Sequence, residues 1–205
     1  MAFAERAVEV TPQALPLQAP APLLHHLLFG EMVHYALRRA GEQGLGVEQV
    51  LKAAGRTAGA RCALLLMAQE RPWRLIPDKA QPAVLQLILG PLWKLVFGAP
   101  AARAKGGGVE VVRTGVDEYH ITDRGHLFTR FCTPNVREVG LVQVGAFTAG
   151  LIEGVVVGAW APGAGCEVTA YFTDVDEASG TARDYTSTTF VVQLRSGGAG
   201  GGAAE

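Results

Sequence analysis

The chain has 205 residues, of which 49% are hydrophobic and 18% charged, and its formal net charge is -1. A chain of this size and composition can bury one sizeable hydrophobic core, so it needs neither disulfides nor a structural metal to fold. The near-zero net charge offers no basic field for nucleic acid and no acidic tail. Its three cysteines lie far apart in sequence and form no CxxC pair, which favours a reducing compartment.

The sequence predicts one domain with a tail at each end. Residues 1–22 form a proline-rich N-terminal arm, because the four prolines in Thr11–Pro22 oppose a regular helix. Residues 196–205, SGGAGGGAAE, form a flexible glycine and alanine tail. The single domain therefore spans residues 23–195. We expect no signal peptide, since no basic segment followed by a compact apolar run begins the chain.

Helices are predicted first and strands later. Apolar residues recur at helical spacing over Leu23–Ala40, Val47–Met67 and Ala83–Phe97. The period then changes to the alternation of short strands at Asp117–Thr122 and His126–Phe131. A glycine-rich helix follows, and the segments CEVTAYFT and TTFVVQL close the chain as a hairpin. The order ααα-ββ-α-ββ predicts an α+β fold with helices laid on an antiparallel sheet.

The helix predicted at Ala146–Gly158 carries a stripe of small residues. Its glycines Gly150, Gly154 and Gly158 stand four residues apart. A glycine inside a helix costs about 1 kcal/mol relative to alanine, so the stripe makes sense where another backbone approaches closely. The only ionisable residue in and around this helix is Glu153, so a membrane span with a GxxxG motif is the rival interpretation. A carboxylate near the bilayer centre costs roughly 2.5–3.5 kcal/mol, and we therefore prefer a buried core helix.

The first predicted helix carries more apolar surface than one core face requires. One face consists of Phe29, Val33, Ala36, Leu37 and Ala40. A second face beside it consists of Leu24, Leu28, Met32 and Tyr35. Either the helix is buried all round, or it buries one face in its own core and offers the other to a partner subunit. We prefer the partner interface, because large apolar patches on a surface mark interaction sites.

Glutamates of the predicted helices indicate no catalytic or metal site. Glu31 and His34 stand at a spacing used by metal ligands, but Arg38, one turn further on, opposes a cation. Glu153 has no visible acid, base or nucleophile as a partner, so we expect a helix residue that faces solvent or a partner. We therefore expect no catalytic residue on these helices.

The second half of the chain indicates no catalytic or cofactor site either. His120 and His126 lie on or beside short strands with Cys132 nearby, yet the spacing is not that of a zinc site. Gly106–Gly108 is no phosphate loop, because no Gly-Lys-Ser/Thr follows and the run leads into a strand. We expect no enzymatic activity, no metal and no cofactor.

A set of short motifs occurs in one order along the chain. They are LFGEMV at Leu28–Val33, GRTAGAR at Gly55–Arg61, WKLVFG at Trp93–Gly98, the strand ending DEYHI, the helix AFTAGLIEGVV and the strand VTAYF. In these motifs the chain resembles the small subunits of the transport protein particle (TRAPP) tethering complex, from about Leu23 to Leu194. The likeness is greatest to subunit five of that family. Several distinct motifs in order are more specific than any one of them.

The resemblance implies a fold and a role. The fold is a layer of four helices packed on a twisted antiparallel sheet. The role is that of a non-enzymatic structural subunit, which pairs with a third-subunit homologue and binds other TRAPP subunits. The assembled complex tethers vesicles and acts as a nucleotide exchange factor for a Rab GTPase in transport from the endoplasmic reticulum to the Golgi apparatus. The expected location is cytoplasmic and peripheral at endoplasmic reticulum and cis-Golgi membranes, through the complex.

The resemblance also bears on single residues. It places Gly55 and Gly59 on the second helix, one turn apart on one face, where close helix packing needs small residues. The third subunit of the family carries a buried acyl chain on a cysteine, but the matching count from Gly59 reaches Leu75, and Cys62 comes too early. We therefore do not carry acylation over. The segments 69–82 and 174–187 are longer than expected and are predicted to decorate the surface.

A second class of function stays open beside the structural subunit. The related vinyl-reductase-like class resembles this fold and keeps a small-ligand pocket between helices and sheet. In that alternative, His120, His126 or Cys132 would line the pocket.

Overall fold

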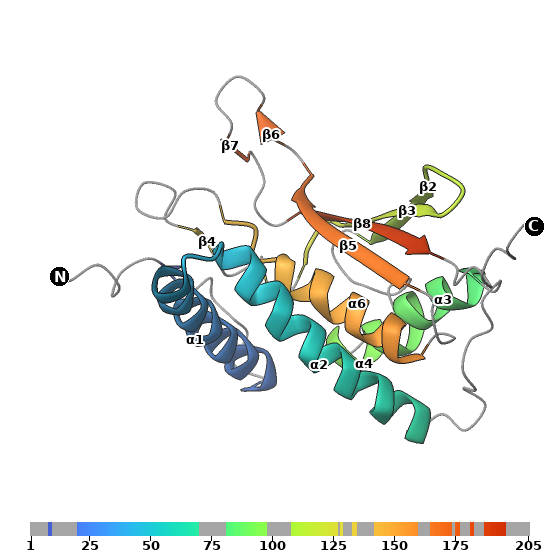
Figure 1. Cartoon of the computed structure of the whole chain (residues 1–205), viewed down its shortest axis with the longest axis horizontal. Helices are drawn as coiled ribbons and strands as arrows, with labels where there is room; N and C mark the ends of the chain where they lie inside the picture. Colours follow the sequence, from blue (N-terminus) through green and yellow to red (C-terminus); the bar gives the residue numbers. More distant parts are fainter. Residues whose placement is uncertain are drawn as a thin grey trace, which may run out of the picture.

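The structure is a computed structural model, and it describes residues 8–9, 20–69, 81–97, 108–126, 128, 133–134, 142–159, 165–173, 175–176, 181–182 and 187–195. Helices fill the first half of the chain (Figure 1). Two strands of the main sheet precede the later helix α6 (Ala146–Ala159), and two follow it. The predicted α+β class and the order ααα-ββ-α-ββ are confirmed.

The main sheet has four antiparallel strands in the order β2-β3-β8-β5. These strands are β2 Val109–Arg113, β3 Glu118–Asp123, β5 Gly165–Phe172 and β8 Thr188–Arg195. The predicted closing hairpin is confirmed, because β5 and β8 pair along their whole length, with Val168 opposite Val192. Strand β5 lies at one edge of the sheet, beside the helices.

The strand predicted at His126–Phe131 is wrong where the structure describes it. His126 and Phe128 belong to no strand, and the hairpin partner of β3 is β2 instead. The reason lies in the turn after β3, where the Asp123 carboxylate accepts a hydrogen bond from the Gly125 N–H at 3.2 Å. Such a side-chain to backbone bond turns the chain away from the sheet.

Helices α1 (Pro20–Gln43) and α2 (Val47–Gln69) are both longer than predicted. Helix α1 begins at Pro20 rather than Leu23. Prolines are tolerated in the first turn of a helix, because the N–H that a proline lacks would have no partner inside the helix anyway. It ends at Gln43 and is followed by Gly44, whose φ of 66° suits a residue without a side chain. The Leu45 N–H then donates to the Ala40 carbonyl at 3.2 Å, which closes the turn.

The third predicted helix, Ala83–Phe97, is not one regular α-helix. It consists of α3 (Gln81–Leu87), a π-helix (Ile88–Leu92) and α4 (Trp93–Phe97). Pro91 lies inside the π-helix and has no N–H to donate, so the regular hydrogen-bond ladder is interrupted there.

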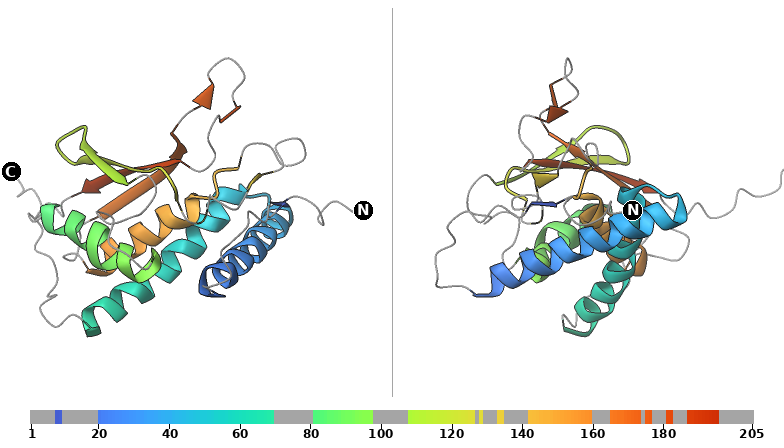
Figure 2. Two further views of the ribbon diagram at one scale, coloured as in Figure 1. Left: turned by 180° about the vertical axis from the view of Figure 1, so that it is seen from behind. Right: turned by 90° about the vertical axis from the view of Figure 1, so that its left-hand side faces the viewer.

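Helix α6 occupies the centre of the molecule. It lies between the sheet and α2, as Figures 1 and 2 both show. Helix α1 packs on α2 at one end of the molecule, while the helices α3 and α4 approach the same face of the sheet as α6. The helical layer thus covers one face of the sheet.

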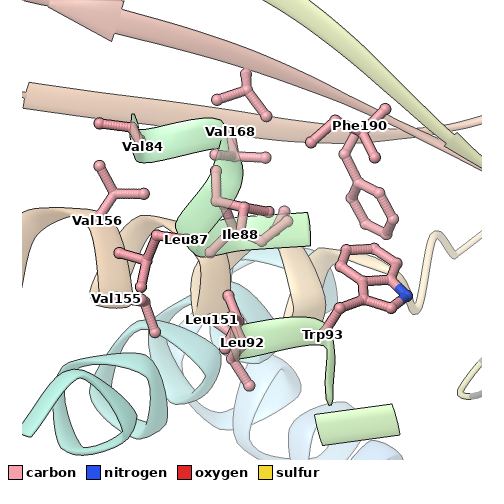
Figure 3. Packing of buried hydrophobic residues seen from close by; sticks show 14 of the residues in the cluster. Val84, Leu87, Ile88, Leu92, Trp93, Leu151, Val155, Val156, Val168 and Phe190 are labelled. Atoms are coloured by element: carbon pink, nitrogen blue, oxygen red, sulfur yellow. The ribbon is translucent and has the colours of Figure 1, made fainter. Parts of the chain in front are cut away.

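The main core lies between α6, the α3–α4 region and the sheet (Figure 3). Its fully buried side chains include Val84, Ile88, Leu92, Trp93, Ile152, Val155, Val168 and Phe190. The rings of Trp93 and Phe190 meet edge to face with centroids 6.4 Å apart. A second cluster joins α1, α2 and the start of α6, where Phe29 stacks on Phe128 at 4.6 Å.

Two short pairs of strands lie outside the main sheet. Strand β1 (Val8–Glu9) pairs with β4 (Thr133–Pro134), and β6 (Val175–Asp176) pairs with β7 (Thr181–Ala182). Most of the proline-rich arm, the segment 70–80, the remainder of 174–187 and the 196–205 tail lie outside the described residues. None of the described helices combines the length and apolar character that crossing a membrane requires.

Candidate functional site

Glycines of α2 lie directly against the backbone of α6. A Cβ atom built on Gly55 would overlap the Phe147 carbonyl oxygen and come within 3.0 Å of the Leu151 nitrogen. One built on Gly59 would overlap the Leu151 carbonyl oxygen and come within 3.0 Å of the Gly154 Cα. The atoms in the way are backbone atoms, which cannot rotate aside. The two glycines therefore sit where the helix backbones touch.

The glycines of α6 occupy the other side of the same contact. A Cβ on Gly150 would come within 2.9 Å of the Arg56 nitrogen, and one on Gly154 within 2.8 Å of the Ala60 nitrogen. Gly158 is different, since its Cβ would meet a side chain, the Ala63 Cβ, at 2.8 Å. Contacts advance along both helices in the same direction, so α2 and α6 run parallel.

Glu153 is fixed beside this contact by two partners. Its carboxylate lies 2.7 Å from Lys52 Nζ on α2 and accepts a hydrogen bond from the Val168 N–H on β5 at 2.7 Å. Only 5% of the residue is exposed, so the expectation that it faces solvent or a partner is wrong. The physical reason is its place on α6, between the next helix and an edge strand whose N–H groups need acceptors.

A cleft of about 490 Å³ opens where α2 meets the edge strand β5 and the end of β8. Its lining consists of Gln49, Lys52, Ala53, Arg56, Glu153, Gly165, Cys166, Glu167 and Arg195. Three of these residues are cations and two are carboxylates. Sequence reasoning missed this site, because its residues come from four separate elements and share no motif.

The second apolar face predicted on α1 is exposed in part. Leu28 is 60% exposed and Tyr35 is 51% exposed, whereas Met32 is half-buried and packs against the second core cluster. The side chain of Leu24 lies outside the described residues. On the adjacent face of the helix, Phe29, Val33, Ala36 and Ala40 are buried. Helix α1 therefore buries one face and presents large apolar side chains beside it.

Leu27 adds to the exposed surface and was not predicted. It is 50% exposed beside Leu28. Helical geometry places it in line with Glu31 and His34, on the stripe read as polar, so the apolar pattern gave no signal for it.

The histidines of the alternative ligand-binding interpretation lie on opposite sides of the sheet. His120 is on the outer face of β3, with Nε2 3.2 Å from Glu118 Oε1, while its neighbours Tyr119 and Ile121 belong to the core. His126 lies on the core side and is fully buried. The structure therefore does not bring these two side chains together, and Cys132 lies outside the described residues.

His126 is the centre of a buried polar network inside aromatic surroundings. Its Nδ1 lies 3.1 Å from Asp123 Oδ2 and its Nε2 lies 2.9 Å from Thr148 Oγ1. The rings of Phe97 and Phe190 pack edge to face against it, each with centroids 5.2 Å apart. The group resembles a catalytic triad in composition, but a fully buried imidazole and a hydroxyl on the core side reach no substrate. It ties the end of β3 to α6.

The described cysteines are half-buried, and the pKa values of both thiols are raised. Burial, with a smaller contribution from the Glu153 carboxylate, raises the pKa of Cys166 to about 12. Burial also raises the pKa of the Cys62 thiol. A high pKa disfavours the thiolate, so neither thiol is poised as a nucleophile. Among the described residues no group of His, Cys, Asp and Glu side chains is arranged to hold a metal ion.

Comparison with known proteins identifies relatives by sequence and by fold. The sequence matches the family described as Transport protein particle (TRAPP) component over residues 25–195. The structure is similar to a trafficking protein particle complex subunit 3 from Naegleria fowleri covalently bound to palmitic acid, at 14% identity and a TM-score of 0.57. That match covers 85% of this chain and 95% of the other, and at this identity it supports the fold alone.

Other likenesses are weaker. Two structures of an Fe(II) unliganded H-NOX protein from K. algicida, one of them a point mutant, are 10% identical to this chain, with TM-scores of 0.40 and 0.41. Each match covers 82% of this chain and 73% of the other, and at these scores it carries no argument. No curated protein matches the chain in sequence.

Proposed function

This chain belongs to the TRAPP component family, and we propose on that basis that it is a non-enzymatic structural subunit of a TRAPP vesicle-tethering complex. Its place in the complex is that of subunit five. It pairs with a third-subunit homologue and, through the assembled complex, supports nucleotide exchange on a Rab GTPase. The transport step is that from the endoplasmic reticulum to the Golgi apparatus, and the chain acts at those membranes as a peripheral, cytoplasmic component.

The observation that carries this proposal is the two-sided helix α1. Its inner side is buried in the second core cluster, while Leu28 and Tyr35 leave more than half of their surface exposed. Exposed aromatic and aliphatic side chains on one face are what a protein–protein interface uses. The proposed partner interface therefore consists of Leu24, Leu28, Met32 and Tyr35.

The proposal includes no acyl group on this chain. The similar subunit 3 structure holds palmitic acid covalently. In this chain, Ile88, Trp93 and Phe190 pack in the core between the helices and the sheet. Cys62 packs half-buried against that same cluster.

Co-production with a third-subunit homologue tests the interface. Leu28→Asp and Tyr35→Asp each place a charge on the proposed surface, and we expect each to weaken the complex by about 10-fold or more, since removing an interface anchor costs ~2 kcal/mol. Val116→Asp is the matched control, because Val116 is 77% exposed on the β2–β3 turn, at the other end of the molecule from α1 (Figure 1). Equal recovery of the partner with all three variants contradicts the interface.

A reconstituted complex tests the role in exchange. Omitting this chain should lower Rab nucleotide exchange, and adding it back should restore it, while the chain alone should give none. Undiminished exchange without the chain contradicts the proposed role, whatever the α1 variants do.

A further inference from the structure

The cleft between α2 and β5 has a charge that its own residues do not balance. Lys52 is paired with Glu153 at 2.7 Å, and Arg195 is paired with Glu167 at 2.9 Å. These two ion pairs use both carboxylates of the lining. Arg56, one turn after Lys52 and exposed, has no hydrogen-bond or ion-pair partner in the part of the chain that the structure describes. The cleft therefore carries one uncompensated positive charge, on a guanidinium.

The opposite wall of the cleft is a strand edge. Among the strands that the structure describes, β5 pairs with β8 alone, and the Val168 N–H points to the other side, where it donates to Glu153. Backbone directions alternate along a strand, so the N–H and carbonyl of Cys166, two residues earlier, point to that same side. Cys166 lines the cleft. Backbone hydrogen-bonding groups and the unpaired guanidinium thus meet at one cleft, and this combination suits an extended peptide with an acidic residue.

We propose that this cleft binds an extended segment of a partner protein, with one acidic side chain of the segment on Arg56 and its backbone along the start of β5. A single unpaired guanidinium matches one singly charged carboxylate, whose two oxygens accept two parallel N–H bonds from the fork of an arginine. A doubly charged phosphate would need a second free cation, and both Lys52 and Arg195 already have carboxylate partners.

The size of the cleft also favours a peptide over a free anion. About 490 Å³ is far more than one carboxylate occupies and lies within the range of sites that hold several groups of a ligand. The site is separate from the outer side of α1, so this inference goes beyond the proposed pairing through that helix.

Selection from a library of random heptapeptides displayed on phage, with the full-length chain as bait, tests the proposal. We expect the bound peptides to share one Asp or Glu at a fixed position, and the enrichment to vanish with Arg56→Glu. The best peptide is then measured by fluorescence anisotropy, together with the same peptide carrying Gln or Asn at that position.

Matched variants decide the role of the guanidinium. Arg56→Ala should weaken the best peptide about 10-fold or more, and Arg56→Lys should weaken it less, because a lysine keeps the charge but not the fork. Arg61→Ala is the control, since Arg61 is exposed on the same helix and does not line the cleft. All three variants should still pair with the third-subunit homologue, which separates this test from that of the proposed function.

Three outcomes overturn the proposal. They are enrichment of peptides without a common acidic position, an unchanged affinity with Arg56→Ala, and binding of inorganic phosphate that the acidic peptide does not displace. The last outcome would show that the cleft takes a free anion.

Discussion

Replacing Gly154 by alanine should destabilise the chain, although alanine is the better helix former. The added Cβ would lie 2.8 Å from the Ala60 nitrogen and 3.0 Å from the Arg56 carbonyl carbon, and it would overlap the oxygen of that carbonyl. All three are backbone atoms of α2, so α2 and α6 must separate to admit the methyl group. Overpacking of this kind costs typically about 1–3 kcal/mol or more, against a gain of about 1 kcal/mol in helix propensity.

We expect the net loss in the free energy of unfolding to be about 2 kcal/mol, towards the upper end of what these two numbers allow. The contact joins backbone to backbone, and moving the helices apart at Gly154 also loosens the contacts of the neighbouring glycines of the stripe. Equilibrium unfolding in urea, followed by tryptophan fluorescence, measures it, since Trp93 is buried in the core next to α6. A shift of the midpoint to lower urea at unchanged slope is the expected result.

Gly41→Ala is the matched control for this experiment. Gly41 lies inside α1, and a Cβ there would have no atom within 4 Å. The same substitution should therefore stabilise the chain, by about 0.4–1 kcal/mol. If Gly154→Ala proves as stable as the wild type, or if both variants change stability in the same direction, the close contact between α2 and α6 is not as described.

Three further predictions concern buried polar groups. Glu153→Ala should lower the free energy of unfolding by about 1–3 kcal/mol, because it leaves Lys52 and the Val168 N–H without their acceptor, and Glu153→Gln should lower it less in the same urea titration. His126→Ala should lower the melting temperature much more than His120→Ala, because it opens a cavity and leaves Asp123 and Thr148 without a partner they share; equal shifts in calorimetry would contradict the network. Cys166 should resist iodoacetamide at pH 9, where its raised pKa of about 12 leaves roughly 500-fold less thiolate than a thiol of the ordinary pKa has. Since the folded pKa lies above the ordinary 9.0, the stability that the neutral buried thiol contributes is present below pH 9 and is lost as pH rises towards 12. Fast alkylation of native Cys166, seen by peptide mapping, would refute the burial of this thiol.

Periodicity and glycine spacing predicted much of this fold. The order of the helices and the closing hairpin β5–β8 follow from apolar period alone, because each of these elements buries one regular face. The hairpin partner of β3 was misplaced. The true partner, β2 at Val109–Arg113, is mostly exposed and shows no clean alternation, whereas the sequence HLFTRF alternates but follows a turn. The π-helix around Pro91 was missed, because the apolar pattern continues through it.

The candidate sites were less accessible to sequence reasoning than the fold. The outer face of α1 has a helical period, so Leu28 and Tyr35 stand out from their spacing in the sequence, and both are exposed. The cleft at Arg56 has no such signature, because α2, α6, β5 and β8 each contribute only one to four of its residues. Glu153 was misread for the same reason. Its partners Lys52 and Val168 come from elements whose packing only the three-dimensional arrangement defines.

Native mass spectrometry can decide whether this chain works as a protein-binding subunit. The chain should be produced together with a third-subunit homologue of the TRAPP family and sprayed without denaturation. We expect a one-to-one complex of the two proteins, with no small molecule retained at stoichiometric amount on this chain. A chain that stays free of the homologue and carries a stoichiometric small molecule instead would contradict the proposed function and support the ligand-binding alternative.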